Sequence, residues 1–255
     1  MLVRLTREQL AAVRRLFPPE RPGPLVAQHV IATGVGAAVA DRWPDPRAVG
    51  AEAGGNWSLA GDPDALDPAD LVGLVRGYVE APAAFEPLLR TAFDDLREWP
   101  RLIFTLDGPD RPPPERRGDH EIRRLGADDA GTLAGLREDA GWIAATWGGP
   151  DGLAASDAAW GAFVGGRLAA VACPFFVGGA HEDLGVVTEP PFRGLGLSTA
   201  CAAAVCHDVR RRGRTPTWTT SPDNSASLRV AEKLGANLQR EDRLLVVGIP
   251  IPAPG

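Results

Sequence analysis

The stretch that decides the fold runs from Val186 to Thr199 and reads VVTEPPFRGLGLST. It begins as an apolar strand, turns through prolines and glycines, and continues into a helix with one apolar stripe. Gly194 and Gly196 allow a tight turn and let a ligand approach the backbone without a Cβ in the way. Because a helix start presents unpaired N–H groups and a positive dipole end, this turn is typical of an anion site, with Arg193 and Ser198 as further donors.

A Gly-x-Gly turn alone is weak evidence, because it marks many ordinary turns. It also overlaps the fingerprint of dinucleotide-binding folds, although Thr199 stands where the third glycine of that fingerprint belongs. A second motif, NSASLRVAEKLG from Asn224 to Gly235, follows after one predicted strand and opens the next predicted helix. A nucleotide-binding sheet stays open as the alternative interpretation.

Together, the patterns R-G-x-G-x-S and N-x-x-S-x5-K-L-G resemble the GNAT superfamily of acyl-CoA-dependent N-acyltransferases, over residues 119–247. The details PTW (Pro216–Trp218) and ACAAA (Ala200–Ala204) resemble a narrower branch with an extra N-terminal domain, which includes proteins similar to the zwittermicin A resistance acetyltransferase. The resemblance implies an α+β (mixed α/β) fold with a central, mostly antiparallel mixed sheet flanked by helices. It also implies acetyl-CoA as the co-substrate.

The resemblance assigns roles within the two motifs. Val186, Val187 and Thr188 would form the strand that pairs with the pantetheine amides, and Asn224 and Ser227 would lie opposite them. The pyrophosphate would be held by Arg193, Gly194, Leu195, Gly196, Leu197, Ser198 and Thr199. For Asn224, a plain helix cap is an equally good interpretation, because asparagine is favoured at that position. No metal is expected in the site.

A general base is useful in this chemistry. An amine with a pKa of about 10 is protonated at neutral pH, and a protonated amine cannot attack a thioester. The resemblance implies a glutamate six residues before the end of the strand, which is Glu182 counted back from Thr188. Asp183 comes next and would face the opposite side of a regular strand. The alternative for Glu182 is a solvated strand end or an ion pair.

The usual acid of the family is missing. Many relatives have a tyrosine seven residues after the motif's asparagine, where this chain has Ala231, and the only tyrosine of the chain is Tyr78. Either Tyr78 reaches across, or serine, cysteine or water replaces it, or no acid is needed.

The acceptor pocket that the resemblance implies lies between the first two helices and the later strands of the second half. Glu138, Asp139 and Trp142 are predicted to line it, with the two acids holding a cationic amine. For a tryptophan at helical spacing, a place in the core is the alternative.

The composition is that of an ordinary soluble globular protein. The 255 residues carry 27 basic and 33 acidic side chains, a net charge of −6 that disfavours a nucleic-acid partner. No window approaches 18 uninterrupted apolar residues and the N-terminus is charged, so neither a membrane partner nor a signal peptide is expected. Three cysteines without C-x-x-C spacing indicate a reducing, cytoplasmic setting. The basic cluster at residues 210–214 is interpreted as a solvated helix end.

A proline-rich stretch, DGPDRPPPERRG, divides the chain, because proline fixes φ and removes backbone donors. In the first half, Leu25–Ala32 is predicted as a strand and Pro68–Val79 as a helix. The predicted parts are a smaller N-terminal α/β accessory domain (1–107), a linker (108–118) and the acyltransferase domain (119–255).

Three functions remain open. The favoured one is an acetyl-CoA-dependent N-acetyltransferase acting on the amine of a small molecule. The alternatives are a non-catalytic acyl-CoA-binding or sensory module and a protein-modifying acetyltransferase. The sequence leaves the oligomeric state, monomer or homodimer, undecided.

Overall fold

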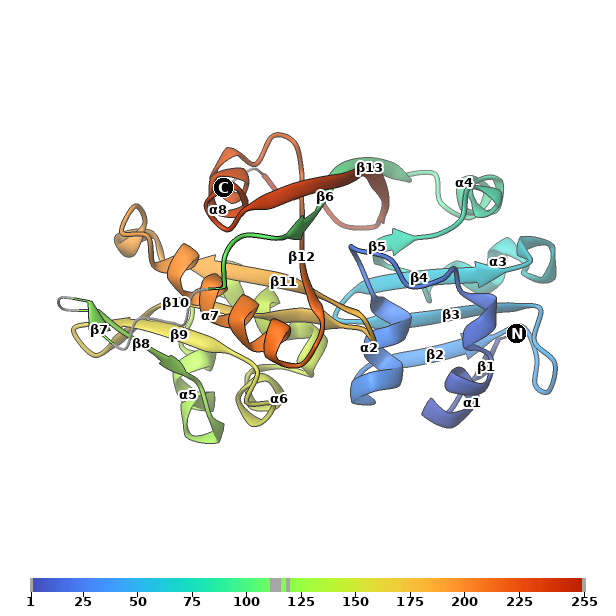
Figure 1. The fold of residues 1–255 in the computed structure, drawn as a ribbon. Helices are drawn as coiled ribbons and strands as arrows, with labels where there is room; N and C mark the ends of the chain where they lie inside the picture. The colour runs from blue at the N-terminus through green and yellow to red at the C-terminus, as the bar shows by residue number, and fades with distance from the viewer. Residues whose placement is uncertain (1, 111–115, 118–119, 254–255) are drawn as a thin grey trace.

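The computed structural model describes residues 2–253 except 111–115 and 118–119. These residues form one 13-stranded sheet in the order β1-β2-β3-β4-β5-β13-β6-β12-β11-β10-β9-β8-β7 (Figure 1). The strands are β1 (Val3–Arg4), β2 (Ala37–Ala40), β3 (Ala48–Ala53), β4 (Asn56–Gly61), β5 (Gly77–Glu80), β6 (Arg97–Leu106), β7 (Arg116–Arg117), β8 (His120–Arg124), β9 (Trp160–Val164), β10 (Arg167–Val177), β11 (His181–Thr188), β12 (Thr215–Thr220) and β13 (Ala236–Val247).

Helices flank this sheet; strands β1 to β5 lie at one end, strands β7 to β11 lie at the other, and the C-terminal strand β13 lies between these two groups (Figure 1). The α-helices are α1 (Arg7–Ala12), α2 (Val26–Thr33), α3 (Pro68–Leu71), α4 (Glu86–Ala92), α5 (Ala130–Ala134), α6 (Pro150–Ala155), α7 (Leu197–Arg211) and α8 (Ser225–Lys233). The 3₁₀ helices are η1 (Arg14–Leu16), η2 (Pro63–Ala65), η3 (Ala83–Phe85), η4 (Ala127–Asp129), η5 (Glu138–Trp147) and η6 (Pro190–Phe192). None of the helices in the described part of the chain is long and apolar enough to cross a membrane.

The sheet is mixed and mostly antiparallel. Its parallel pairs are β4 with β5 and β11 with β12, and the other neighbours are antiparallel. The predicted fold class, a mostly antiparallel mixed sheet flanked by helices, is therefore confirmed.

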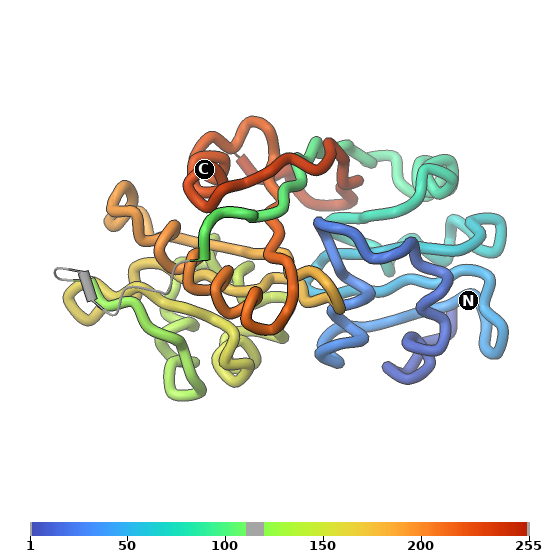
Figure 2. The backbone as a smooth tube through the Cα atoms, in the orientation of Figure 1, coloured from blue at the N-terminus to red at the C-terminus, as the bar shows by residue number. Residues whose placement is uncertain are grey.

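Strand β6 connects the two halves of the chain. It comes from the first half, yet it pairs with β12 on one side and β13 on the other, and the end of β13 pairs in turn with β5. Figure 2 shows this stretch, in green, beside the red tube of β13. The predicted boundary at residue 107 thus lies between strands of one continuous sheet. Of the predicted linker, residues 111–115 and 118 lie outside the described part, and residues 116–117 form β7.

Helix α7 packs on this sheet through the apolar stripe that the sequence predicts. Leu197, Cys201, Val205 and Val209 recur every four residues and are all at most 3% exposed, against β9, β10 and β11. Burial of each leucine or valine side chain in this stripe stabilises the fold by about 1.5–3 kcal/mol. This packing fixes the start of α7 beside the end of β11.

Two local predictions in the first half are wrong. The segment predicted as a strand at 25–32 is helix α2, because its apolar residues pack on β3 and β10, and Gly34 ends the helix with a φ of 75°. The segment predicted as a helix at 68–79 stops at Leu71 and reopens as β5. Gly73, with a φ of 81°, adopts the left-handed conformation just after the end of the helix, and Gly77, with a φ of 116°, is the first residue of β5.

Cutting the chain between the two halves is expected to leave them associated, because β6 is paired along both of its edges. A protease site inserted after Asp110 tests this. After cleavage the two fragments should elute together in native size-exclusion chromatography and separate only in denaturant. Separation of the cut fragments under native conditions would contradict the shared sheet.

Candidate active site

The site begins where β11 and β12 separate. The two strands pair in parallel from His181 opposite Thr215 to Leu184 opposite Trp218. Beyond this point β11 continues to pair with β10, and β12 continues to pair with β6. The edge of β11 at residues 185–188 therefore has no strand partner on the β12 side within the described residues. Such an edge offers backbone N–H and C=O groups to an extended ligand.

The glycine turn at the end of this edge leads into α7. Gly194 and Gly196 have φ of 81° and 78°, and a Cβ built on either would meet nothing within 4 Å. No side chain caps the helix, and its first backbone bond runs from Ala200 N to Gly196 O at 3.1 Å. The amides of residues 197–199 thus have no partner in the described part of the chain. Open space beside free amides at a helix start suits an anionic group.

One buried polar atom on β11 also lacks a partner. Thr188 Oγ1 is fully buried and forms no hydrogen bond with the described residues. Because buried hydroxyl groups are normally hydrogen-bonded, an orphan at the end of the open edge indicates a place that a ligand group completes.

On the opposite side of the opening, Asn224 caps helix α8. Its Oδ1 accepts a hydrogen bond from Ser227 N at 2.9 Å, which confirms the helix-cap interpretation. Ser227 Oγ accepts another from Trp218 Nε1 at 2.9 Å. The side-chain nitrogen of Asn224 has no partner among the described residues, so its predicted role toward a ligand remains compatible with the cap.

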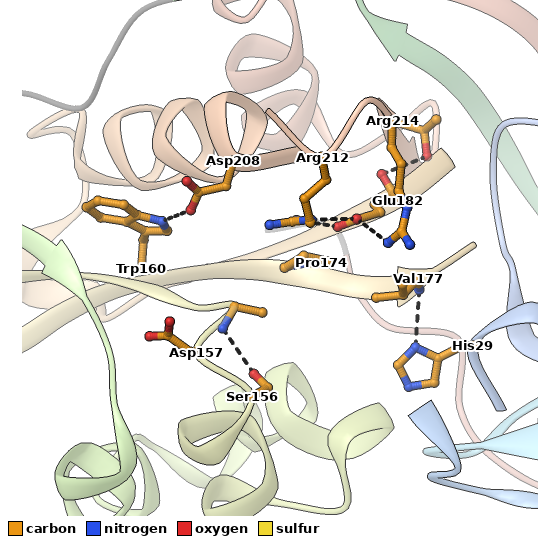
Figure 3. Close-up of polar contacts among 12 residues, drawn as sticks. His29, Ser156, Asp157, Trp160, Pro174, Val177, Glu182, Asp208, Arg212 and Arg214 are labelled. Atoms are coloured by element: carbon orange, nitrogen blue, oxygen red, sulfur yellow. Dashed lines mark hydrogen bonds and ion pairs between the residues drawn. The ribbon is translucent and has the colours of Figure 1, made fainter. Parts of the chain in front are cut away.

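Glu182 is held in a buried ion pair. It is 1% exposed, and it accepts hydrogen bonds from Arg212 Nε at 3.0 Å, Arg212 Nη2 at 2.7 Å and Arg214 Nη1 at 2.8 Å (Figure 3). Both carboxylate oxygens are occupied, so these contacts argue against the predicted role of Glu182 as the base. They favour the ion-pair alternative. They also correct the interpretation of the basic cluster, because two of its arginines serve a buried acid.

Asp183 points to the other face of the sheet. Its Oδ1 accepts hydrogen bonds from Thr217 Oγ1 at 2.8 Å and Thr219 Oγ1 at 3.0 Å, while Oδ2 has no partner among the described residues. Burial raises the pKa of Asp183 to about 6, against the two threonine hydrogen bonds and the positive charges of Arg101 and Arg240. A carboxylate with one fixed oxygen, one free oxygen and a raised pKa is suited to accept a proton.

Asp183 belongs to a row of side chains across neighbouring strands, which we call the polar face: Asp183 on β11, Arg101 on β6, Arg240 on β13 and Tyr78 on β5. Arg101 Nη2 donates to Thr219 O at 3.0 Å, and its guanidinium carbon lies 4.1 Å from the ring centre of Trp99. Tyr78 packs on Trp99 at 5.2 Å between ring centres, and burial raises its pKa. Tyr78 therefore does reach the same face as Asp183.

The residues predicted to bind the acceptor lie on η5, beside this face. Trp142 is 46% exposed, and its ring atom Cζ3 would lie 3.2 Å from a Cβ at Gly185, so it flanks the open edge of β11 and is not a core residue. Glu138 and Asp139 are exposed, and Asp139 pairs with Arg137 at 2.9 Å. Of these three, the structure brings only Trp142 against the edge.

The alanine that replaces the family's tyrosine, the cysteines and the candidate metal ligands do not add to the site among the described residues. Ala231, at the position of the missing tyrosine, is buried, and burial raises the pKa of Cys201 and of Cys206 to about 12. Both cysteines are buried in the core beneath α7. No group of three or more His, Cys, Asp or Glu in the described ranges is arranged to hold a metal ion.

Comparison with known proteins identifies this arrangement. A family model described as GNAT acetyltransferase matches residues 157–243. A protein from Streptomyces virginiae, named as an uncharacterized N-acetyltransferase in the mutA 5′ region, is 43% identical over 213 residues, 83% of this chain and 90% of that protein. The chain belongs to the GNAT acetyltransferase family.

Solved structures place the whole GNAT chain in a shared fold. A GCN5-related N-acetyltransferase-like protein from Streptococcus suis matches with a TM-score of 0.71 and 20% identity, over 94% of this chain and 99% of that one. A tandem GNAT protein from the clavulanic acid biosynthesis pathway matches with a TM-score of 0.56 and 13% identity, over 96% of each chain. These likenesses extend across both halves and concern the fold alone.

Replacing Asp183 by asparagine is expected to stabilise the protein at high pH. The pKa in the folded state, about 6, exceeds the ordinary value of 3.8, so stability falls as pH rises through this window and the charged carboxylate opposes folding above it. Asp183→Asn keeps an oxygen for both threonines. It should raise the free energy of unfolding by up to about 3 kcal/mol at pH 8.

Asp129→Asn is the matched control for this substitution. Hydrogen bonding to Arg123 lowers the pKa of Asp129, so the control should lose stability at pH 8. Thermal unfolding at pH 8 and pH 4 checks both. A gain for Asp183→Asn that persists unchanged at pH 4, or a loss at pH 8, would show that its charge is not opposed by burial.

Proposed function

We propose that this GNAT protein is an acetyl-CoA-dependent N-acetyltransferase that acts on the amine of a small molecule. The carrying observation is the open edge of β11, which runs from the polar face to the free amides at the start of α7. The residues along this line fit an extended, anionic co-substrate at one end and a basic acceptor at the other. The free, buried cysteines are in keeping with a cytoplasmic setting.

Residues at both ends of this line would bind acetyl-CoA, which supplies the activated acetyl group as a thioester. The backbone of Val186, Val187 and Thr188 would pair with the pantetheine amides as an added strand. Residues 193–199 would hold the pyrophosphate through the free amides of residues 197–199 and the side chains of Arg193 and Ser198, each charge-assisted hydrogen bond contributing on the order of 1.5–3 kcal/mol. Asn224 would donate its free side-chain nitrogen from across the opening, and Ser227 would support it.

Asp183 is the proposed base, in place of Glu182. Its Oδ2 accepts the proton of the acceptor ammonium, and the neutral amine then bonds to the acetyl carbon as the carbon–sulfur bond breaks. The sulfur leaves as a thiolate and takes a proton from water or Tyr78, while the acylated nitrogen loses its second proton to water to give the amide. Because a thiol with a pKa of about 8.5 is already a tolerable leaving group, the alanine at position 231 does not prevent the reaction.

Adding a negative side chain at the glycine turn should weaken binding of acetyl-CoA. Gly196→Glu fills the open space beside the α7 amides and repels a pyrophosphate, so its dissociation constant should rise at least tenfold by calorimetry. Gly166→Glu is the matched control, because Gly166 has a φ of 77°, a Cβ there meets nothing within 4 Å, and it lies in the β9–β10 turn. Equal effects of the two variants would remove residues 193–199 from the proposed site.

The pH dependence of turnover should follow Asp183. With a pKa of about 6, Asp183 gains its basic form as pH rises, so kcat/KM should climb through about pH 6 in the native enzyme. Asp183→Asn should lower kcat at least a hundredfold and remove that limb, whereas Glu182→Gln should keep its midpoint. Thiol release measured from pH 5 to 9 checks this. Loss of the limb in Glu182→Gln alone would restore Glu182 as the base.

A further inference from the structure

Arg101 forms no ion pair with any acidic side chain among the described residues. Its recorded hydrogen bond runs from Nη2 to the backbone oxygen of Thr219, and none of the ion pairs among the described residues includes it. Its Nε is fully buried and has no hydrogen-bond partner in the part of the chain that the structure describes. Burial lowers the pKa of Arg101 to about 10, although the negative charge of Asp183 favours its charged form. An incompletely satisfied guanidinium is costly to bury, which points to an anion that completes it.

Other arginines in similar surroundings pair with carboxylates of the protein itself, although Arg240 Nη2 is also buried without a hydrogen-bond partner among the described residues. Arg123 pairs with Asp129 at 2.6 Å, and Arg212 pairs with Glu182 at 2.7 Å. Arg240, on the same face as Arg101, bonds Asp242 at 2.9 Å and the backbone oxygen of Pro22 at 2.5 Å. Arg101 therefore differs from them in lacking a carboxylate.

The position of Arg101 is fixed relative to Asp183. The same residue, Thr219, donates its hydroxyl to Asp183 Oδ1 and accepts Arg101 Nη2 on its backbone oxygen, each at 3.0 Å. Trp99, two residues before Arg101 on β6, packs its ring against the guanidinium group. Thr219 thus holds the carboxylate of Asp183, which can pair with an ammonium, close to the guanidinium of Arg101, which can pair with an anion. One small molecule could contact both groups.

We propose that Arg101 binds a carboxylate of the acceptor, so that the substrate is an amino acid or a similarly small molecule with an amine and a carboxylate a few carbon atoms apart. This inference rests on the proposed N-acetyltransferase function. The fork of N–H groups matches a carboxylate, and a phosphate dianion would meet stronger repulsion from Asp183. Arg101 would act in substrate selection, and Asp183 in proton transfer.

The test is thiol release from acetyl-CoA with a panel of L-amino acids and their amides, which differ in the carboxylate. Wild type should acetylate one or more of the acids, and for the best acid Arg101→Gln should lower kcat/KM at least tenfold, mainly through KM, while the value for its amide changes less than about twofold. The amine of an amino acid amide has a lower pKa than that of the acid, so the two substrates differ in reactivity for a reason unrelated to Arg101. The readout is therefore the ratio of wild-type to variant kcat/KM, compared between the acid and its amide. Arg240→Gln is the control and should keep the preference for the acid.

Calorimetry with acetyl-CoA on each variant separates the possible failures. If acetyl-CoA binds but no amino acid is acetylated, or if Arg101→Gln lowers acid and amide equally, the carboxylate inference is overturned and the acetyltransferase proposal stands. If acetyl-CoA does not bind the wild type, the proposed function falls, and this inference falls with it.

Discussion

The end of the parallel pairing between β11 and β12 is the constraint on which the site depends. Each strand is held on its far side, β11 by β10 and β12 by β6, so both stay in the sheet while the edge between them opens beyond Leu184 and Trp218. The α7 stripe then anchors the helix start at the end of that opening. A free strand edge and a free helix start in one line are what the proposed binding of an extended thioester requires.

The alternation of side chains along β11 divides the work between two faces. Glu182 faces α7, where Arg212 and Arg214 tie the beginning of the strand to the far end of the helix. Asp183 lies on the polar face, where burial keeps its pKa high. A buried charge of this kind opposes folding above its pKa, so the proposed base is also a residue whose charge makes the fold less stable.

Patterns that depend on local physics were predictable from the sequence. The glycine turn, the α7 stripe and the cap at Asn224 each follow from backbone freedom, helical periodicity or side-chain hydrogen bonding over a few residues. The insertion of β6 between β12 and β13 was not predictable, because strand pairing across more than a hundred residues leaves no local pattern. For the same reason Arg101, in the first half of the chain, carried no signal as a partner of the second-half site. The sequence could not indicate whether Glu182 or Asp183 is the better candidate base, because this depends on the arginines that pair with Glu182 on one face and the threonines that bond Asp183 on the other.

Hydrogen–deuterium exchange of the intact protein with and without acetyl-CoA tests the central claim most directly. If acetyl-CoA lies along the open edge, amides at 185–188 and 194–199 should exchange more slowly in its presence, and a smaller effect is expected at the start of α8. Strands β2, β3 and β4 should be unchanged, because they lie in the other half of the sheet. Protection that misses the β11 edge and the glycine turn, or no protection at saturating acetyl-CoA, would contradict the account.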